Sequence, residues 1–151
     1  MPQPGDVFEI NTARGEAYVQ FMQKNKLMGS AIRVLPGTYV GGNSDIESLV
    51  RTDAGYWIFF PLSAALKAKV VRRVGAFEIP SHSKKLPLFR SGVVDPATGR
   101  IENWWLWDGE NSRMVGAITD EQRRLPIKSI WNDTLLVERI EQGWSPEKHG
   151  G

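Results

Sequence analysis

The sequence contains no cysteine, and this absence excludes three kinds of chemistry at once. Disulfide bonds, thiolate metal sites and thiol nucleophiles all need cysteine side chains. A chain without cysteine fits a reducing compartment. We therefore expect a cytoplasmic protein.

Long hydrophobic runs are also missing. The longest apolar run, residues 56–60, is far shorter than the roughly 20 residues that cross a membrane as a helix. The N-terminus has no basic stretch followed by an apolar run, which a signal peptide would show. The sequence predicts neither export nor insertion into a membrane.

Histidine is scarce as well. His82 lies in a loop rich in serine and lysine, and His149 lies in a glycine-rich tail. Transition-metal sites normally need several His or Cys ligands, and a Ser or Thr nucleophile needs a positioned base. We therefore expect no metal, no cofactor and no enzymatic activity. A hydrolase with an acid pair such as Asp108 and Glu138 is a further alternative.

Charge of one sign is not in strong excess. The formal net charge is +2 and the pI is near 9.0. Nucleic-acid-binding domains usually gather their basic residues into a stripe, whereas here they are scattered, with the densest cluster at residues 67–73. A small-barrel nucleic-acid-binding module is therefore the alternative rather than the leading hypothesis.

The sequence does contain short segments in which apolar and polar residues alternate. This period of two is typical of half-buried strands, and it appears in residues 5–10, 17–23 and 30–35. Residues 56–60 have no polar face, which predicts a strand covered on both sides. Further strands are expected at residues 70–79, 93–94, 101–107 and 135–140.

Helix signals are few and short. Ser44 with Glu47, and Thr119 with Gln122, match the capping box, in which the first side chain accepts a hydrogen bond from a free amide of the first turn. Pro61 suits the first turn of a helix that runs to Lys67.

The class is therefore α+β and dominated by β. Hairpin-length connections between about seven or eight strands and three short helices favour antiparallel pairing. We expect a small bent antiparallel sheet or an SH3-like barrel. At 151 residues the chain has the length of one domain, so we predict a single domain over residues 1–151, with residues 1–4 and 145–151 as loose tails.

Tryptophan is the abundant feature. Five of the six tryptophans lie between Ile101 and Trp144. In a strand, Trp105 and Trp107 would share one face and Trp104 the other. Either all of them pack in the core, or one face is an anchor for a partner, since Trp is enriched at binding hot spots.

The second reading defines a candidate surface for binding a partner. Its aromatic residues are Trp105 and Trp107. Neighbouring acids, Asp108, Glu110 and Asp133, would form its rim.

Five stretches of the chain resemble the immunity protein 26 family. They are Gly5–Ile10, Ile32–Gly37, Phe59–Leu62, Trp104–Gly109 and the tract from Leu125-Pro126-Ile127 to Trp131-Asn132-Asp133. The resemblance spans nearly the whole chain. It implies a small cytoplasmic protein of bacterial polymorphic toxin systems, which protects its producer by binding a cognate toxin domain. It supplies no catalytic residues, so the expected function is non-catalytic neutralisation of a protein toxin.

Overall fold

The chain forms two compact units. The structure is a computed structural model and describes residues 1–149. Unit 1 is Met1–Lys84 with Ser129–Trp144, and unit 2 is Lys85–Lys128 with the residues from Ser145 on. The expectation of a single domain stays a prediction, and each unit is described by itself.

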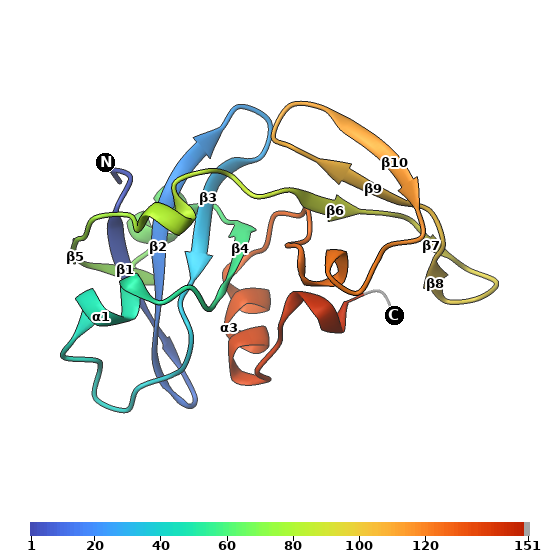
Figure 1. The fold of residues 1–151 in the computed structure, drawn as a ribbon. Coiled ribbons are helices and arrows are strands. Elements are labelled where there is room, and N and C mark those ends of the chain that lie inside the picture. Colours follow the sequence, from blue (N-terminus) through green and yellow to red (C-terminus); the bar gives the residue numbers. More distant parts are fainter. Residues whose placement is uncertain (150–151) are drawn as a thin grey trace. The chain divides into compact units, whose positions relative to one another are not determined.

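Unit 1 is built on a five-stranded antiparallel sheet in the order β4-β3-β2-β1-β5 (Figure 1). Its strands are β1 (Asp6–Thr12), β2 (Gly15–Asn25), β3 (Gly29–Val34), β4 (Tyr56–Phe59) and β5 (Val71–Ala76). Within residues 1–149 the end strands β4 and β5 do not pair with each other, so the sheet is open. The predicted antiparallel sheet and the β-dominated α+β class are confirmed, and the closed-barrel alternative is wrong.

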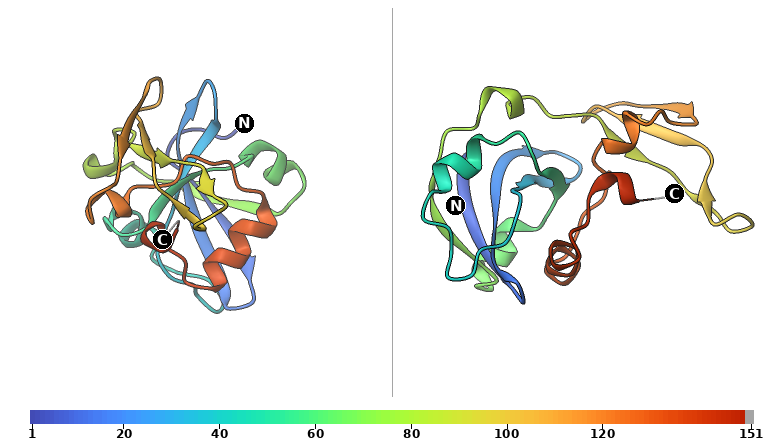
Figure 2. Two further views of the ribbon diagram at one scale, coloured as in Figure 1. Left: turned by 90° about the vertical axis from the view of Figure 1, so that its right-hand side faces the viewer. Right: turned by 60° about the horizontal axis from the view of Figure 1, so that its bottom comes forward.

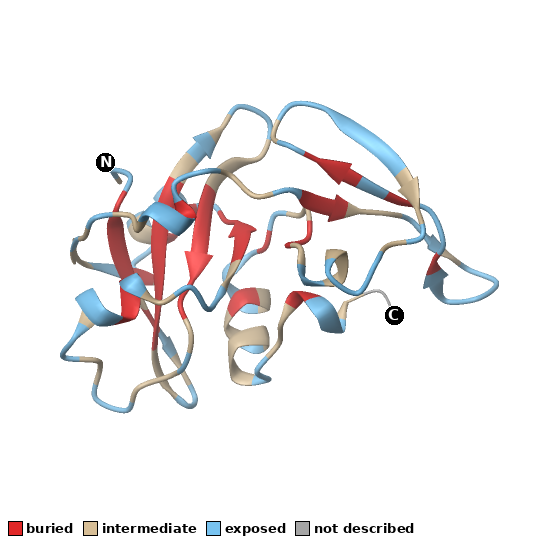
Figure 3. Cartoon of the chain, in the orientation of Figure 1, coloured by how far each residue is buried: buried red, intermediate tan, exposed pale blue. Residues whose placement is uncertain are grey.

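Both faces of this sheet are buried, because its strands carry apolar residues on alternating sides. Phe8 and Ile10 of β1 face one core, and Val7 faces the other. The first core also receives Trp131 and Leu136, and the second receives Leu49 and Val50 of α1 (Ile46–Arg51). Figure 3 shows the strands of this sheet largely buried.

The helices of unit 1 cover this sheet. Besides α1 there are α2 (Leu62–Lys67), α3 (Asp133–Glu141) and the 3-10 turn η1 (Ser81–Ser83). Helix α1 is capped by Asp45, whose side chain accepts from the amide of Ser48, so the predicted cap at Ser44 is one residue too early. Figure 2 shows α3 in orange-red beside the sheet of its unit.

The strand predicted at residues 135–140 is wrong, since these residues lie in α3. The Asn132 side chain accepts a hydrogen bond from the amide of Leu135, which satisfies a free donor of the first helical turn. Leu136, one turn before Ile140, is fully buried. Short apolar runs do not distinguish a strand from a helix, and here the cap and the packing decide.

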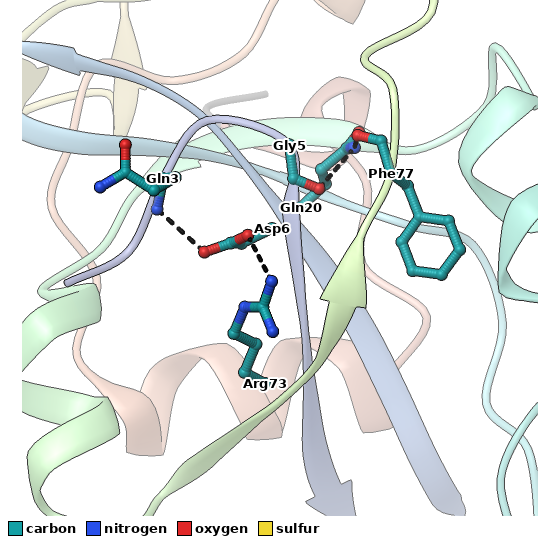
Figure 4. A network of polar contacts seen from close by, with 6 residues as sticks. All are labelled: Gln3, Gly5, Asp6, Gln20, Arg73 and Phe77. Carbon is teal, nitrogen blue, oxygen red and sulfur yellow. Dashed lines mark hydrogen bonds and ion pairs between the residues drawn. The ribbon is translucent and has the colours of Figure 1, made fainter.

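The Gly5-Asp6 opening forms a buried corner of unit 1 (Figure 4). Gly5 has a φ of +98°, and a Cβ there would lie 2.7 Å from the Phe77 carbonyl oxygen, so only glycine fits. Asp6 accepts hydrogen bonds from Arg73 and from the amide of Gln3. The buried Gln20 amide donates to the carbonyls of Gly5 and Phe77. This motif of the resemblance thus holds β1 and the end of β5 together.

Unit 2 contains a three-stranded antiparallel sheet in the order β10-β9-β6 and a separate two-stranded hairpin, β7-β8. Its elements are β6 (Phe89–Ser91), β7 (Val94–Asp95), β8 (Arg100–Ile101), β9 (Trp104–Trp107), β10 (Ser112–Gly116) and the 3-10 turns η2 (Gln122–Arg124) and η3 (Pro146–Lys148). The predicted hairpin turn at residues 95–99 is confirmed, and strand β10 was not predicted. The capping box at Thr119 and Gln122 forms with both reciprocal hydrogen bonds, but it opens a 3-10 turn.

A single buried arginine holds unit 2 together. Arg90 of β6 is fully buried, and its guanidinium donates to the backbone carbonyls of Leu125, Arg123, Pro146 and His149. Burial first, and the charge of Arg123 second, lower the pKa of Arg90 to about 10. Within the predicted tail, Pro146–Lys148 form η3 and Pro146 and His149 accept hydrogen bonds from Arg90, and the rest of that predicted tail, residues 150–151, lies outside the described residues.

The segment 126–131 closes one strand edge in each unit. In unit 2, the Arg90 amide donates to the Pro126 carbonyl and the Lys128 amide donates to the Arg90 carbonyl. In unit 1, the Trp131 amide donates to the Phe59 carbonyl. A covered edge offers no free backbone groups for aggregation.

Candidate protein-binding surface

The five predicted binding residues fall in two different units. Trp105, Trp107, Asp108 and Glu110 belong to unit 2, whereas Asp133 belongs to unit 1. Asp133 is exposed in the first turn of α3, where a negative charge interacts favourably with the helix dipole. Its structural role is therefore to start a helix, and it is not part of the surface of unit 2.

Trp107 is buried, with only 1% of its surface exposed. Its ring meets Phe89, its partner across β6 and β9, edge-on at 5.6 Å between centroids. The Lys128 ammonium lies 4.7 Å above the same ring. Trp107 is therefore core, and its predicted place on an exposed surface is corrected.

Trp104 lies on the opposite face of β9 and is also buried. The Arg90 guanidinium lies 4.4 Å from its ring centroid. Leu106 shares this face and is buried too. One face of β9 is thus wholly internal.

Trp105 is the exposed tryptophan of β9, with 42% of its surface exposed. It pairs directly across the β9–β10 ladder with Met114, which is 58% exposed. Directly opposite residues on one sheet face lie about 5 Å apart at Cβ. We call this pair the Trp105 face. Figure 3 shows β10, which carries Met114, largely exposed.

A small hollow adjoins the Trp105 face. It has a volume of about 220 Å³ and is lined by Val93, Asp95, Glu102, Asn103 and Trp105. We call it the Trp105 hollow. Its two acids were not among the predicted rim residues, because they come from β7 and from the link between β8 and β9. The available signals were the position of Glu102, two residues before Trp104, and that of Asp95 at the start of the hairpin turn that precedes β9.

Asp108 and Glu110 form the β9–β10 turn. One carboxylate oxygen of Asp108 accepts hydrogen bonds from the amides of Glu110 and Asn111 at 2.9 and 2.8 Å. These backbone bonds, the one from Asn111 first, hold the pKa of Asp108 below its usual value. Asp108 therefore fixes a turn, while Glu110 is exposed beside it.

The proposed acid pair of a hydrolase is not brought together in either unit. Asp108 lies in unit 2 and Glu138 in unit 1. Glu138 accepts a hydrogen bond from Gln142 one turn later in α3. Each carboxylate thus has a local structural partner.

His82 is not simply solvated. Its Nε2 faces the Arg51 carbonyl oxygen at 3.1 Å, which requires a proton on that nitrogen, and its Nδ1 then accepts from the Ser83 hydroxyl at 2.8 Å. Ser83 is buried, so its oxygen is not accessible to a substrate. The pair joins η1 to the end of α1.

The densest basic cluster is partly neutralised. Arg72 forms an ion pair with Glu9 at 2.7 Å, and Arg73 forms one with Asp6 at 3.2 Å. Burial tends to raise the pKa of Glu9, but the hydrogen bonds from Arg72 and Tyr18 outweigh it, so the pKa of Glu9 lies below its usual value. This arrangement weakens the case for a basic stripe that binds nucleic acid.

Metal coordination is a further possibility for the side chains of residues 1–149. Over this range no three His, Asp or Glu side chains gather closely enough to hold a metal ion. Of the helices described, none has the length and apolar character needed to cross a bilayer.

Comparisons with known proteins returned no match: no family model, no curated protein and no solved structure is similar to this chain at a significant level.

Proposed function

We propose that this chain is a non-catalytic, cytoplasmic binding protein of the immunity type, which binds a cognate toxin domain and neutralises it. The observation that carries the proposal is the Trp105 face, on which a half-exposed tryptophan stands opposite an exposed methionine. Large apolar side chains of this kind supply much of the energy at protein interfaces. The resemblance to immunity protein 26 supplies the class of partner.

Two features of the chain support binding rather than catalysis. Asp108, Glu138 and His82 are engaged in a turn, a helix and a loop contact, respectively. Trp105 and Met114 of unit 2 are exposed, and the acids Asp95 and Glu102 line the hollow beside Trp105. This combination suits a protein partner more than a polyanion.

The test is co-expression of the tagged full chain with the toxin domain encoded beside its gene in the host. We expect one-to-one copurification that survives high salt, together with protection of the cells from the toxin. Trp105→Ala should weaken the complex at least about 30-fold, the effect of a hot-spot residue worth about 2 kcal/mol. Leu27→Ala is the control, since Leu27 is also apolar and exposed but lies in unit 1.

The outcomes separate the functional classes. Absence of a complex with that toxin domain, or equal loss with Leu27→Ala, would refute the proposal. Bound nucleic acid that is released as salt rises would instead support the small-barrel alternative, because neutralised phosphates make affinity fall with salt.

A further inference from the structure

We infer that the Trp105 hollow binds a cationic side chain, an arginine or lysine on the surface of the protein partner. This inference rests on the proposed function and names the chemistry of the contact. It follows from three features of the described residues: an exposed tryptophan with no cation over its ring, two carboxylates and the size of the hollow.

Cations over tryptophan rings recur in this protein. In unit 2, Arg90 lies over Trp104 and Lys128 over Trp107. In unit 1, Arg139 contacts both Trp131 and Trp144, at 4.5 and 4.8 Å from their centroids. Trp faces attract cations through the negative potential above the ring.

Trp105 differs from these four. Within residues 1–149, no cation of the chain is placed over its ring, although 42% of the residue is exposed. Trp57, the remaining tryptophan, is buried. Trp105 is thus the tryptophan whose face remains available to a cation from outside.

The charge of the hollow fits the same ligand. Asp95 and Glu102 line it together with Trp105. A cation in the hollow would therefore be attracted by two negative carboxylates as well as by the face of the tryptophan ring. An anion or a phosphate would meet two carboxylates at close range. The hollow therefore selects by the sign of the charge.

The size of the hollow points to one side chain. At about 220 Å³ it is below the range of about 300–1,000 Å³ typical of sites for drug-sized molecules. It can hold the head group of one side chain while Met114 and Val93 offer apolar contact beside it. Both of these residues are exposed, as the rim of an interface would be.

Arg100 is a nearby competitor for these carboxylates. It lies opposite Asp95 in the β7–β8 pair, but it is not among the residues that line the hollow. Its positive charge lowers the attraction of the site for another cation. Removing this charge should therefore strengthen binding rather than weaken it.

The test uses the full chain and a small probe. Nα-acetyl-arginine methylamide is titrated while the indole N–H resonances are followed by NMR, with the Trp105 signal assigned from Trp105→Leu. The neutral isostere, Nα-acetyl-citrulline methylamide, is titrated in parallel. We expect the Trp105 signal to shift with the arginine probe, and to shift much less with the citrulline probe.

Single substitutions test which carboxylates attract the arginine probe. Glu102→Gln should weaken binding of the arginine probe about three- to fivefold, the usual range for an exposed ion pair. Asp95→Asn should act similarly, because asparagine can still accept from the Ala97 amide that Asp95 binds in the turn. Glu110→Gln should leave binding unchanged, and Arg100→Ala should strengthen it.

Several results would overturn the inference. These are equal shifts with the citrulline probe, unchanged affinity in Glu102→Gln, equal weakening in Glu110→Gln, or a stronger shift of Trp105 with a thymidine oligonucleotide than with the arginine probe.

The inference and the proposed function fail in different ways. If the toxin complex is lost in Trp105→Ala but keeps its affinity in the Asp95→Asn, Glu102→Gln double variant, the function stands and the cation site is wrong. If the arginine probe binds as expected and the toxin domain does not, the site stands and the proposed function is wrong.

Discussion

The two units solve the same packing problem to different extents. Unit 1 buries both faces of its five-stranded sheet, because its helices and loops supply apolar side chains to each side. In unit 2 the burial is confined to β6 and β9, with Arg90, Trp104 and Leu106 buried on one face and Phe89 and Trp107 on the other, whereas β10 has no buried residue. A sheet face without a covering element remains available to a partner. The candidate surface therefore lies where no further segment of unit 2 covers Trp105 and Met114.

The two units also share one kind of buried polar contact. Each contains a buried arginine that donates to backbone carbonyls: Arg33 to those of Val50 and Thr52, and Arg90 to those around η2 and η3. Arg33 thereby satisfies free carbonyls at the end of α1. Arg90 instead ties distant segments of unit 2 into one body.

The largest effect is expected on β9 itself. Trp107→Ala should lower the free energy of unfolding by about 3–5 kcal/mol, because it empties a buried aromatic site. Trp105→Ala, two residues away, should cost about 1 kcal/mol or less, since its ring is half exposed. Urea unfolding followed by circular dichroism measures both. Similar losses for the two variants would contradict the assignment of one tryptophan to the core and the other to the surface.

A slightly smaller effect is expected at the arginine of unit 2. Arg90→Met should destabilise the protein by about 3 kcal/mol, because several buried carbonyls lose a charged donor. Hydrogen exchange should rise in residues 145–149, which Arg90 orders. Arg124→Met, at an exposed arginine of η2, is the control and should stay within about 0.5 kcal/mol of the wild type. Unchanged exchange in residues 145–149 would count against the role of Arg90.

The corner of unit 1 should respond to a single methyl group. Gly5→Ala should cost about 2 kcal/mol, since the residue has positive φ and its Cβ would overlap the Phe77 carbonyl. Gly99→Ala is the matched control, because φ is +70° there but no atom lies within 4 Å of the added Cβ. Thermal unfolding should rank Gly5→Ala well below Gly99→Ala. Equal losses would mean that strain alone, and not the close approach, sets the cost.

The smallest effect concerns pH. The pKa of Glu9 is lowered in the folded chain, so its interactions stabilise the protein above the unfolded-state pKa of 4.5 and are lost as pH falls through the lower folded value. Glu9→Gln should therefore cost about 1 kcal/mol at pH 7 and progressively less below pH 4.5. Urea unfolding at several pH values measures the difference. A difference that stays constant down to acidic pH would rule out the ionised Glu9–Arg72 pair as its source.

Much of unit 1 could be predicted from local patterns. The alternation in β1, β2 and β3 and the apolar run of β4 give the correct strands, because each pattern reports burial on one or both faces. The apolar run at residues 135–140 predicts a strand by its length, but the cap at Asn132 starts a helix there. Strand β10 was missed, since its residues are mostly exposed and show little alternation.

The candidate site could be predicted only in part. The alternation of side chains along a strand is enough to place Trp105 and Trp107 on one face of a tryptophan-rich strand, because the period of a strand is two. Which of the two is buried depends on tertiary packing: Phe89 and Lys128 cover Trp107, while Trp105 stays exposed beside Asp95 and Glu102. Exposure depends on which distant segments pack above a side chain, and no local pattern records their position.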